Sequence, residues 1–362
     1  MDKRTLNFQA DRIEMILAAH KTPARVYGGQ LTPRAIQFHL APAATTKLTR
    51  LETLTEEIAL ALGAASARLT RTGGTLMLEV PRRDASFVSL ADLTAQLHQH
   101  ADLRPILGSP GVAILGLDNA GMPLILRLAS PEIAHCLIAG TTGSGKTELA
   151  RTLLASMTAH QKPHTLQIAL FDPKAHSFAP FAHAPHLLFP IVSNAEDTLA
   201  RMGYLVAEME RRARLAITCP RIVLVVDELA DWLQLCGAEL ENLLTRLTQR
   251  GRSAGISVIA CTQKPTARAV GSLIKANFPA RLVGRVASTD DARVAAGIGG
   301  TGAEKLAGRG DFLLVAAGET IRFQAAHISA EAIAAQCAPH TQTAIPSPGL
   351  RARVLTQLRR VK

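Results

Sequence analysis

One octapeptide constrains the fold of this chain more than any other stretch: Gly140-Thr141-Thr142-Gly143-Ser144-Gly145-Lys146-Thr147. It matches the pattern G-x-x-x-x-G-K-[ST], in which glycines let the backbone curl until successive N–H groups face a phosphate at a helix N-terminus. The apolar run 136–139 before it predicts a buried strand, and the run that begins at Glu148 is compatible with a helix. The pattern predicts an ATP site formed by residues 140–148, in which Lys146 binds the β- and γ-phosphates and the Thr147 hydroxyl binds Mg²⁺.

A second stretch predicts the acidic half of the same site. The apolar run 222–226 ends in Asp227-Glu228, which indicates a buried strand followed by two carboxylates. Burying an acidic pair is costly unless a cation or a reacting group uses it. We expect Asp227 to organise Mg²⁺ and its waters, and Glu228 to activate the attacking water as a general base.

The order of apolar runs predicts the fold class. From Gly111 onward, strand-like runs alternate with helical ones, which favours an α/β fold with a mostly parallel sheet. The expected strands cover residues 112–115, 124–126, 136–139, 165–171, 222–226, 257–260, 281–285 and 311–315. Before Gly111 the runs indicate a smaller α+β unit, with helices over 11–20, 51–62 and 88–98, strands over 34–40, 67–70 and 75–80, and a linker at 105–110. We therefore expect a small domain at 1–105, a large P-loop domain at 106–330 and a basic, flexible tail at 331–362.

Composition limits the partners and the compartment. The chain has 40 Lys and Arg against 29 Asp and Glu, a net charge of +11, which favours polyanions such as nucleic acid or an anionic membrane surface. The five cysteines form no C-x-x-C pair, so a zinc ribbon or a disulfide framework is not expected. The sequence has neither an apolar run long enough to span a bilayer nor the apolar block of a signal peptide. We expect a cytoplasmic protein, or one that is tethered only through a partner.

Several stretches, taken together, resemble the motor of the FtsK/SpoIIIE-type DNA translocases, which are P-loop ATPases with a RecA-like fold. They follow in the family's order: HCLIAGTTGSGKT at 135–147, ALFDPK at 169–174, residues 185–212, VLVVDELAD at 223–231, LTRLTQRGRSAGISVIACTQKP at 244–265, GSLIKANFPARL at 271–282 and GRGDFLL at 308–314. Residues 24–97 resemble the family's smaller α domain, so the likeness extends over nearly the whole chain.

The resemblance implies a hexameric ring that moves along double-stranded DNA, together with further site residues. Arg252 matches an arginine finger that reaches a neighbouring subunit's ATP, with Arg250 as the competitor for that role. Gln263 matches a polar sensor of the γ-phosphate. Lys264 and Lys275 match positions in loops that face the central pore and its DNA. The scarcity of aromatic residues, 4% of the chain, also favours duplex over single-stranded DNA, because single strands are commonly bound by stacking.

The sequence also departs from the cell-division members of that family. We expect no membrane anchor, because no run in the sequence resembles one, and we expect no winged-helix module that reads orienting DNA sequences, because few residues follow Ile328. A separate DNA-orienting, recombinase or membrane-anchor partner is therefore a possibility that the sequence leaves open. Where relatives often carry a basic residue, this chain has Ser288-Thr289-Asp290, so one DNA contact is expected to be missing.

Three other functions remain open at this stage. A conjugation-type pump would share the fold and prefer single-stranded DNA. A secretion-type ATPase would export protein, although such enzymes often carry motor domains in tandem and need no basic charge. A non-motor DNA-binding protein could use ATP only to control its assembly.

Overall fold

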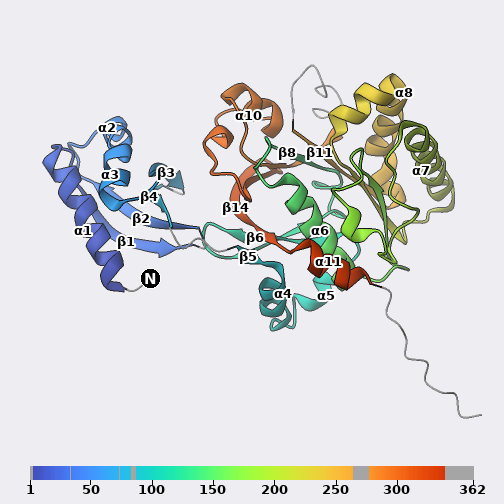
Figure 1. Ribbon diagram of the computed structural model, residues 1–362, viewed down its shortest axis with the longest axis horizontal. Coiled ribbons are helices and arrows are strands. Elements are labelled where there is room, and N and C mark those ends of the chain that lie inside the picture. The colour runs from blue at the N-terminus through green and yellow to red at the C-terminus, as the bar shows by residue number, and fades with distance from the viewer. Residues whose placement is uncertain (1–2, 33, 73, 83–86, 264–276, 339–362) are drawn as a thin grey trace, which may run out of the picture.

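The structure is a computed structural model that describes residues 3–32, 34–72, 74–82, 87–263 and 277–338. The chain forms a small N-terminal domain and a larger domain, which lie side by side along the long axis of the molecule (Figure 1). Within the part of the chain that the structure describes, every helix is too short or too polar to cross a bilayer.

The small domain is an antiparallel sheet of order β1-β2-β4-β3 covered by helices. Its elements are α1 (Lys3–Ala19), β1 (Ala24–Leu31), β2 (Ala35–Pro42), α2 (Leu48–Thr53), α3 (Thr55–Leu62), β3 (Arg68–Thr72) and β4 (Thr75–Pro81). Apolar side chains of α1, α3 and the sheet, including Ile13, Ile58 and Phe38, form its core. The helix expected over 51–62 is two helices that meet at Leu54, and β1 was not expected.

The large domain is built on one long sheet of order β7-β6-β14-β13-β12-β8-β11-β10-β9, with β5 beside β14. Its strands are β5 (Val88–Ser89), β6 (Val112–Asp118), β7 (Pro123–Arg127), β8 (Cys136–Ala139), β9 (Leu166–Phe171), β10 (Arg221–Val226), β11 (Ile256–Thr262), β12 (Ala280–Val283), β13 (Asp311–Ala316) and β14 (Glu319–His327). The expected α/β class is confirmed. Strands β12 through β9 are parallel, whereas the pairings from β7 through β12 are antiparallel, so the sheet is mixed.

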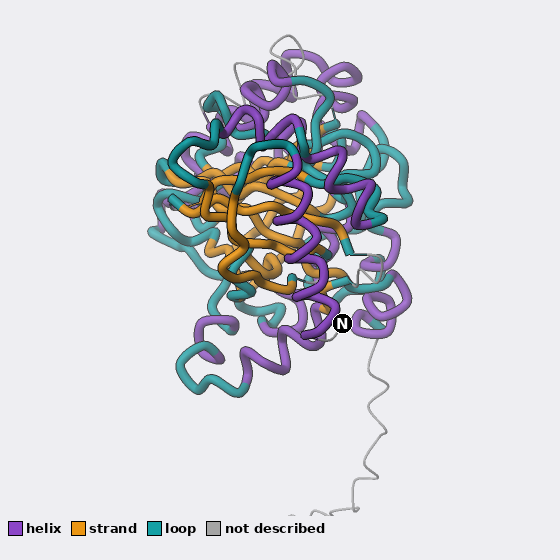
Figure 2. The backbone as a smooth tube through the Cα atoms, turned by 90° about the vertical axis from the view of Figure 1, so that its left-hand side faces the viewer, coloured by secondary structure: helices purple, strands orange, loops and turns teal. Residues whose placement is uncertain are grey.

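Helices cover both faces of the large sheet (Figure 2). They are α4 (Leu90–His98), α5 (Arg104–Leu107), α6 (Lys146–His160), α7 (Ala195–Leu215), α8 (Leu229–Arg250), α10 (Thr289–Ala296) and α11 (Ala330–Cys337), with 3₁₀ turns η1 (Ala179–Phe181), η2 (Gly251–Ala254) and η3 (Ala303–Lys305). Strand β8 shows why its sequence is uniformly apolar. Cys136 and Ile138 enter one core cluster, and Leu137 and Ala139 enter the other, because alternate residues face opposite sides of a strand.

The segment between the two sheets packs against the large one. Val88, Leu90 and Leu107 are buried in the core cluster that also contains α6 and β14. The stretch 105–110, expected to be a linker, instead overlaps α5 (Arg104–Leu107). Pro105 lies in the first turn of this helix, where the missing N–H has no intrahelical acceptor to lose.

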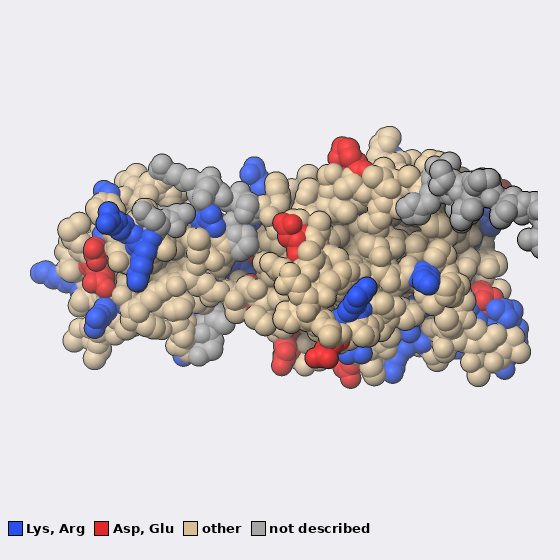
Figure 3. Space-filling view, turned by 90° about the horizontal axis from the view of Figure 1, so that it is seen from below, with Lys and Arg blue, Asp and Glu red and all other residues tan. Residues whose placement is uncertain are grey.

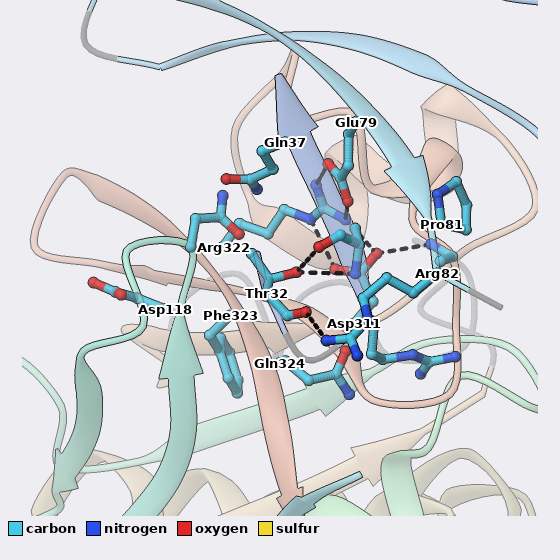
Figure 4. A pocket seen from close by; sticks show the side chains of 14 residues that line it. Thr32, Gln37, Glu79, Pro81, Arg82, Asp118, Asp311, Arg322, Phe323 and Gln324 are labelled. Carbon is cyan, nitrogen blue, oxygen red and sulfur yellow. Dashed lines mark hydrogen bonds and ion pairs between the residues drawn. The ribbon is translucent and has the colours of Figure 1, made fainter. Parts of the chain in front are cut away.

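A network of charged side chains joins the two domains (Figure 4). Arg322 on β14 donates hydrogen bonds to Glu79 on β4, at 2.6 and 3.2 Å, and to Asp311 on β13, at 2.8 Å through both Nε and Nη2. Arg68 on β3 binds the same Glu79 at 3.0 Å and the carbonyl oxygen of Lys305 at 2.8 Å. Glu79 and Asp311 are buried. Because a buried charge is tolerated only when it is paired, the network favours one arrangement of the two domains.

Candidate active site

The loop between β8 and α6 has the shape that the octapeptide predicted. Gly140, Gly143 and Gly145 have φ angles of 156°, 80° and 101°, which favour glycine over residues with a Cβ. A Cβ at Gly145 would approach the amide nitrogen of Gly310 to 2.9 Å. Helix α6 begins at Lys146, and the N–H groups of a first helical turn lack intrahelical acceptors. The loop therefore presents backbone donors suited to a phosphate.

Contacts with the rest of the domain hold this loop in place. Thr141 donates to the carbonyl oxygen of Arg285 through its amide nitrogen, at 2.8 Å, and through its hydroxyl, at 3.0 Å. The amide nitrogen of Ser144, which is fully buried, donates to the carbonyl oxygen of Thr141 at 3.1 Å. The contact between Ser144 and Thr141 holds the loop internally, and the contacts with Arg285 hold it to the segment that follows β12.

Lys146 is buried at the end of the loop, with 6% of its surface exposed. Burial lowers the pKa of its ammonium group, while Cys261, Glu228 and Asp227 act in the opposite direction. A buried ammonium group has lost water and gains stability from an anion beside it. Its position at the N-terminus of α6 thus adds a point charge to the backbone donors of the loop.

The two carboxylates lie at the end of β10. Asp227 and Glu228 are both buried, and burial raises the pKa of each. The amide nitrogen of Asp227 donates to the carbonyl oxygen of Phe171 at 2.9 Å. Glu228 has φ 45° and ψ 62°, a left-handed conformation that is uncommon for a residue with a side chain. Such backbone strain occurs most often at functional sites.

Gln263 connects the phosphate-binding loop to the acidic pair. It follows β11, which lies between β8 and β10 in the sheet. Its amide nitrogen donates to Oε1 of Glu228 at 3.0 Å, and its own Oε1 accepts a hydrogen bond from the Thr142 hydroxyl at 2.9 Å. The carboxyl ends of three parallel strands thus bring Gln263, Glu228 and the loop into direct contact.

The first turn of α6 contains the remaining residues that the octapeptide predicted. Thr147 follows Lys146, and both residues line a cavity beside the phosphate-binding loop. Glu148 accepts a hydrogen bond from Arg151 at 2.8 Å and lies 3.6 Å from Nε2 of His327 on β14. Both side chains therefore border the space beside the phosphate-binding loop.

A second loop, Gly308–Gly310, supports the phosphate-binding loop. The amide nitrogens of Arg309 and Gly310 donate to the carbonyl oxygens of Gly143 and Ser144 at 2.9 and 2.8 Å. All three residues of the Gly308–Gly310 loop have positive φ. The sequence analysis included residues 308–314 in the resemblance but assigned them no role, because nothing in that stretch indicates a contact with the phosphate-binding loop.

The other residues assigned from the sequence do not join this cluster. Arg252 is exposed in η2, just before β11 begins. Because β11 runs parallel to β8, whose carboxyl end leads into the phosphate-binding loop, Arg252 lies at the opposite edge of the sheet. Arg250 ends α8 beside it. Lys264 and Lys275 lie outside the described residues.

Comparison with protein families gives two matches. The profile of the FtsK/SpoIIIE family matches residues 108–219, and that of the FtsK alpha domain matches residues 1–82. Among curated proteins, DNA translocase FtsK of Halalkalibacterium halodurans is 32% identical over 92% of this chain and 45% of its own length. DNA translocase SpoIIIE of Bacillus subtilis strain 168 is 31% identical over 91% of this chain and 44% of its own length. The chain thus spans about half the length of these relatives.

Solved structures share the fold at lower identity. The conjugation coupling protein TcpA of pCW3, in its monomer form, aligns with a TM-score of 0.61 and 17% identity over 90% of this chain and 96% of its own. The cytoplasmic domain of the type VII secretion ATPase EccC of Thermomonospora curvata aligns with a TM-score of 0.59 and 24% identity, over 70% of this chain and 35% of its own. These likenesses support the P-loop ATPase fold.

Proposed function

The chain is a P-loop ATPase of the FtsK/SpoIIIE family, and from that premise we propose that it uses ATP hydrolysis to move along double-stranded DNA as a hexameric ring. The observation that carries the catalytic part is the position of Gln263, which contacts both the phosphate-binding loop and Glu228. A movement of the phosphate-binding loop on binding or loss of the γ-phosphate would shift the side chain of Gln263, and its backbone amide would pass that shift to Glu228. The DNA part rests on relatives that are named DNA translocases and on the charge of the chain.

The residues at the site fit Mg²⁺. Burial and the neighbouring Asp172 raise the pKa of the Asp227 carboxyl, so a cation beside it would stabilise its charged form. Mg²⁺ prefers oxygen ligands, and the hydroxyl of Thr147 and the carboxylate of Asp227 supply them. The ion would neutralise charge on the phosphates. In this proposal Lys146 and backbone N–H groups of the phosphate-binding loop and the first turn of α6 bind the phosphates themselves.

Glu228 is the general base of the proposed reaction. Burial raises its pKa, which moves the carboxylate toward the range where it both stays ionised and accepts a proton. The hydrogen bond from the amide nitrogen of Gln263 to Oε1 fixes one oxygen and leaves the other for the attacking water. The proton of that water passes to Glu228 as its oxygen attacks the γ-phosphorus, and the bond from this phosphorus to the β–γ bridging oxygen breaks, which releases ADP and inorganic phosphate.

Arg252 completes the site of a neighbouring subunit in this proposal. Arg252 and the phosphate-binding loop of the same subunit lie at opposite edges of the sheet. In a head-to-tail ring, the edge that carries Arg252 in one subunit can face the edge that carries the phosphate-binding loop in the next subunit. An arginine that reaches the neighbour's ATP would stabilise charge in the transition state. Each ATP would then join two subunits, so hydrolysis could shift them relative to each other.

Duplex DNA is the proposed partner. A ring that moves along any sequence binds the phosphate backbone rather than base edges, which requires Lys and Arg. In the view of Figure 3, basic side chains gather over the small domain and are scattered among acidic ones on the large domain. The pore contacts that we propose, Lys264 and Lys275, lie outside the described residues. Separate DNA-orienting, recombinase or anchoring partners stay part of the proposal.

The test is steady-state ATP hydrolysis by the full chain without DNA, with single-stranded DNA and with linear duplex DNA, each at two salt concentrations. We expect duplex DNA to stimulate hydrolysis most, and the stimulation to weaken as salt rises because phosphate contacts release counterions. Lys146→Ala is the control that should abolish activity under every condition.

Each other result contradicts the proposal in a defined way. Stimulation by single strands alone would indicate a conjugation-type pump. If neither form of DNA changes the rate of hydrolysis, a protein substrate is indicated. Nucleotide binding without hydrolysis would indicate a protein that uses ATP only to control its assembly.

A further inference from the structure

A cavity of about 520 Å³ extends from the phosphate-binding loop toward the junction of the two domains. Lys146, Thr147 and Glu148 line one part of it, and β14 with Phe87 lines another. A phosphate group at Lys146 would occupy only the first part. The remainder is large enough to receive more of a ligand than its phosphates.

Two aromatic rings, those of Phe87 and His327, line this cavity. The rings of Phe87 and His327 are stacked, with centroids 4.9 Å apart and an angle of 30° between their planes. Phe87 is 67% exposed, although a phenylalanine usually buries most of its surface. The stacked pair therefore offers an apolar aromatic surface beside a phosphate site.

Backbone contacts hold the aromatic pair in place. Strand β5 pairs with β14, with Ala326 opposite Val88 and His327 opposite Ser89, so the residue before β5 is held next to the end of β14. The buried hydroxyl of Thr152 on α6 donates to the carbonyl oxygen of Ala326 at 2.9 Å. The helix that begins at Lys146 thus fixes the strand that carries His327.

A short chain of contacts links the pair to the phosphate-binding residues. Nε2 of His327 lies 3.6 Å from Oε2 of Glu148, and Glu148 is two residues beyond Lys146. In a nucleotide, the sugar separates the phosphates from the base. A nucleotide with its phosphates at Lys146 could therefore pass its sugar over the first turn of α6 and bring its base to the aromatic pair.

We propose that Phe87 and His327 form the subsite that binds the base of the nucleotide, by stacking a purine against the aromatic pair. This inference rests on the proposed function, namely that residues 140–148 bind the phosphates of ATP. Stacking uses the flat faces of the base and is therefore tolerant of its edge groups. The subsite selects purine nucleotides over ligands that have phosphates but no base.

The test is isothermal titration calorimetry of the full chain, in Mg²⁺ buffer, with two ligands. One is a non-hydrolysable ATP analogue, and the other is inorganic triphosphate, which has no base. For Phe87→Ala we expect affinity for the analogue to fall about tenfold or more, the amount that removal of one stacking ring costs, and affinity for triphosphate to stay within twofold. Phe87→Trp should keep the affinity for the analogue.

Phe8→Ala is the matched control, because Phe8 on α1 is 63% exposed and is no part of the cavity. It should change the affinity for neither ligand. Phe87→Trp supplies a second measurement: its fluorescence should change when the analogue binds and stay constant when triphosphate binds. The native Trp232 is fully buried. The same titration of the wild-type chain measures the fluorescence change of Trp232, which is subtracted from that of Phe87→Trp.

The outcomes separate the two proposals. If Phe87→Ala binds the analogue as the wild type does, or weakens both ligands equally, the base subsite is refuted while the phosphate site stands. If the wild type binds neither ligand, the proposed function fails first. If Phe87→Ala does not fold, a fluorescence of Phe87→Trp that fails to respond to the analogue would refute the subsite.

Discussion

Arg34 of the small domain donates hydrogen bonds to the carbonyl oxygen of Arg309 and, at 3.4 Å, to that of Gly308. The amide nitrogen of Arg309 in turn donates to Gly143 in the phosphate-binding loop. One loop, Gly308–Gly310, therefore contacts both the small domain and the phosphate-binding loop. This direct connection makes the conformation of the ATP site sensitive to a residue that touches no nucleotide.

We predict that Arg34→Ala lowers the kcat of ATP hydrolysis about fivefold, because one net hydrogen bond is worth about 1 kcal/mol. The KM for ATP should change less, since the residues that bind phosphate remain. Arg34→Lys keeps a donor and should recover part of the loss. Steady-state kinetics checks this, with Arg4→Ala on the exposed face of α1 as the control. Equal kinetics of Arg34→Ala and the wild type would refute the connection.

Glu228→Gln should bind ATP and fail to hydrolyse it. The amide oxygen can still accept the hydrogen bond from Gln263, but the side chain can no longer accept a proton from water. General-base catalysis contributes a factor on the order of 10²–10⁴, so kcat should fall by that amount. Nucleotide binding and turnover are measured on the same preparation. Turnover at the wild-type rate would show that another group is the base.

Arg252→Ala should lose activity and regain part of it when mixed with Glu228→Gln. If Arg252 acts on the neighbouring subunit, each site takes Glu228 from the subunit that binds ATP and Arg252 from the next subunit. A site whose ATP is bound by an Arg252→Ala subunit and whose neighbour is a Glu228→Gln subunit therefore has every catalytic group intact. Random mixing at equal amounts gives about a quarter of the wild-type sites, since each half of a site is intact half of the time. If Arg252 acts on its own subunit, the mixture stays inactive.

The stability of the protein should depend on pH through Asp311. Burial raises the pKa of this carboxyl from 3.8 to about 6 in the folded chain, against the opposing charge of Arg68. The folded state then binds the proton more tightly than the unfolded state, so the free energy of unfolding falls as pH rises from about 4 to about 6, by roughly 3 kcal/mol for this group alone. Asp311→Asn carries no titrating group at this position.

Relative to the wild type, Asp311→Asn should therefore gain stability as pH rises through that window. Thermal unfolding of both proteins at pH 4.5 and pH 7 measures the difference. Asp290→Asn, on an exposed position of α10, is the matched control. The stability of Asp311→Asn minus that of the wild type should increase with pH. If this difference stays constant or decreases as pH rises, the raised pKa of Asp311 is contradicted.

The sequence predicted the strands that carry local signals. Strand β8 was predicted with its correct bounds, because four apolar residues lie directly before a glycine-rich loop. The predicted strand at 222–226 and the carboxylates after it also lie where expected, at the end of β10. Both cases depend on neighbouring residues alone, and a strand buried on both faces leaves a continuous apolar run.

Strand β14 was missed because its signal is not local. Residues 319–327 include Glu319, Arg322 and Gln324, so the run is not apolar. Arg322 is tolerated there because Glu79 and Asp311, both distant in sequence, bind its guanidinium. Strand β5 has only two residues and forms through pairing with β14, so Val88 and Ser89 were expected to begin a helix.

The positions of the candidate site residues were predictable only where the sequence signal is local. Lys146 and Asp227 belong to local sequence patterns, and these patterns predicted their positions after β8 and after β10. The support from Gly308–Gly310 and the contact between Phe87 and His327 join segments that lie far apart along the chain. Only the folded chain reveals them.

The shared carboxylate of Glu79 also limits how such proteins can exchange parts during evolution. A recombination event that joined this large domain to a foreign small domain would keep Arg322 and Asp311 but replace Glu79 and Arg68. Unless the incoming sheet brought a carboxylate to the same place, the partly buried guanidinium of Arg322 would lose one of the two carboxylates that bind it. The two domains are therefore expected to be inherited as a matched pair.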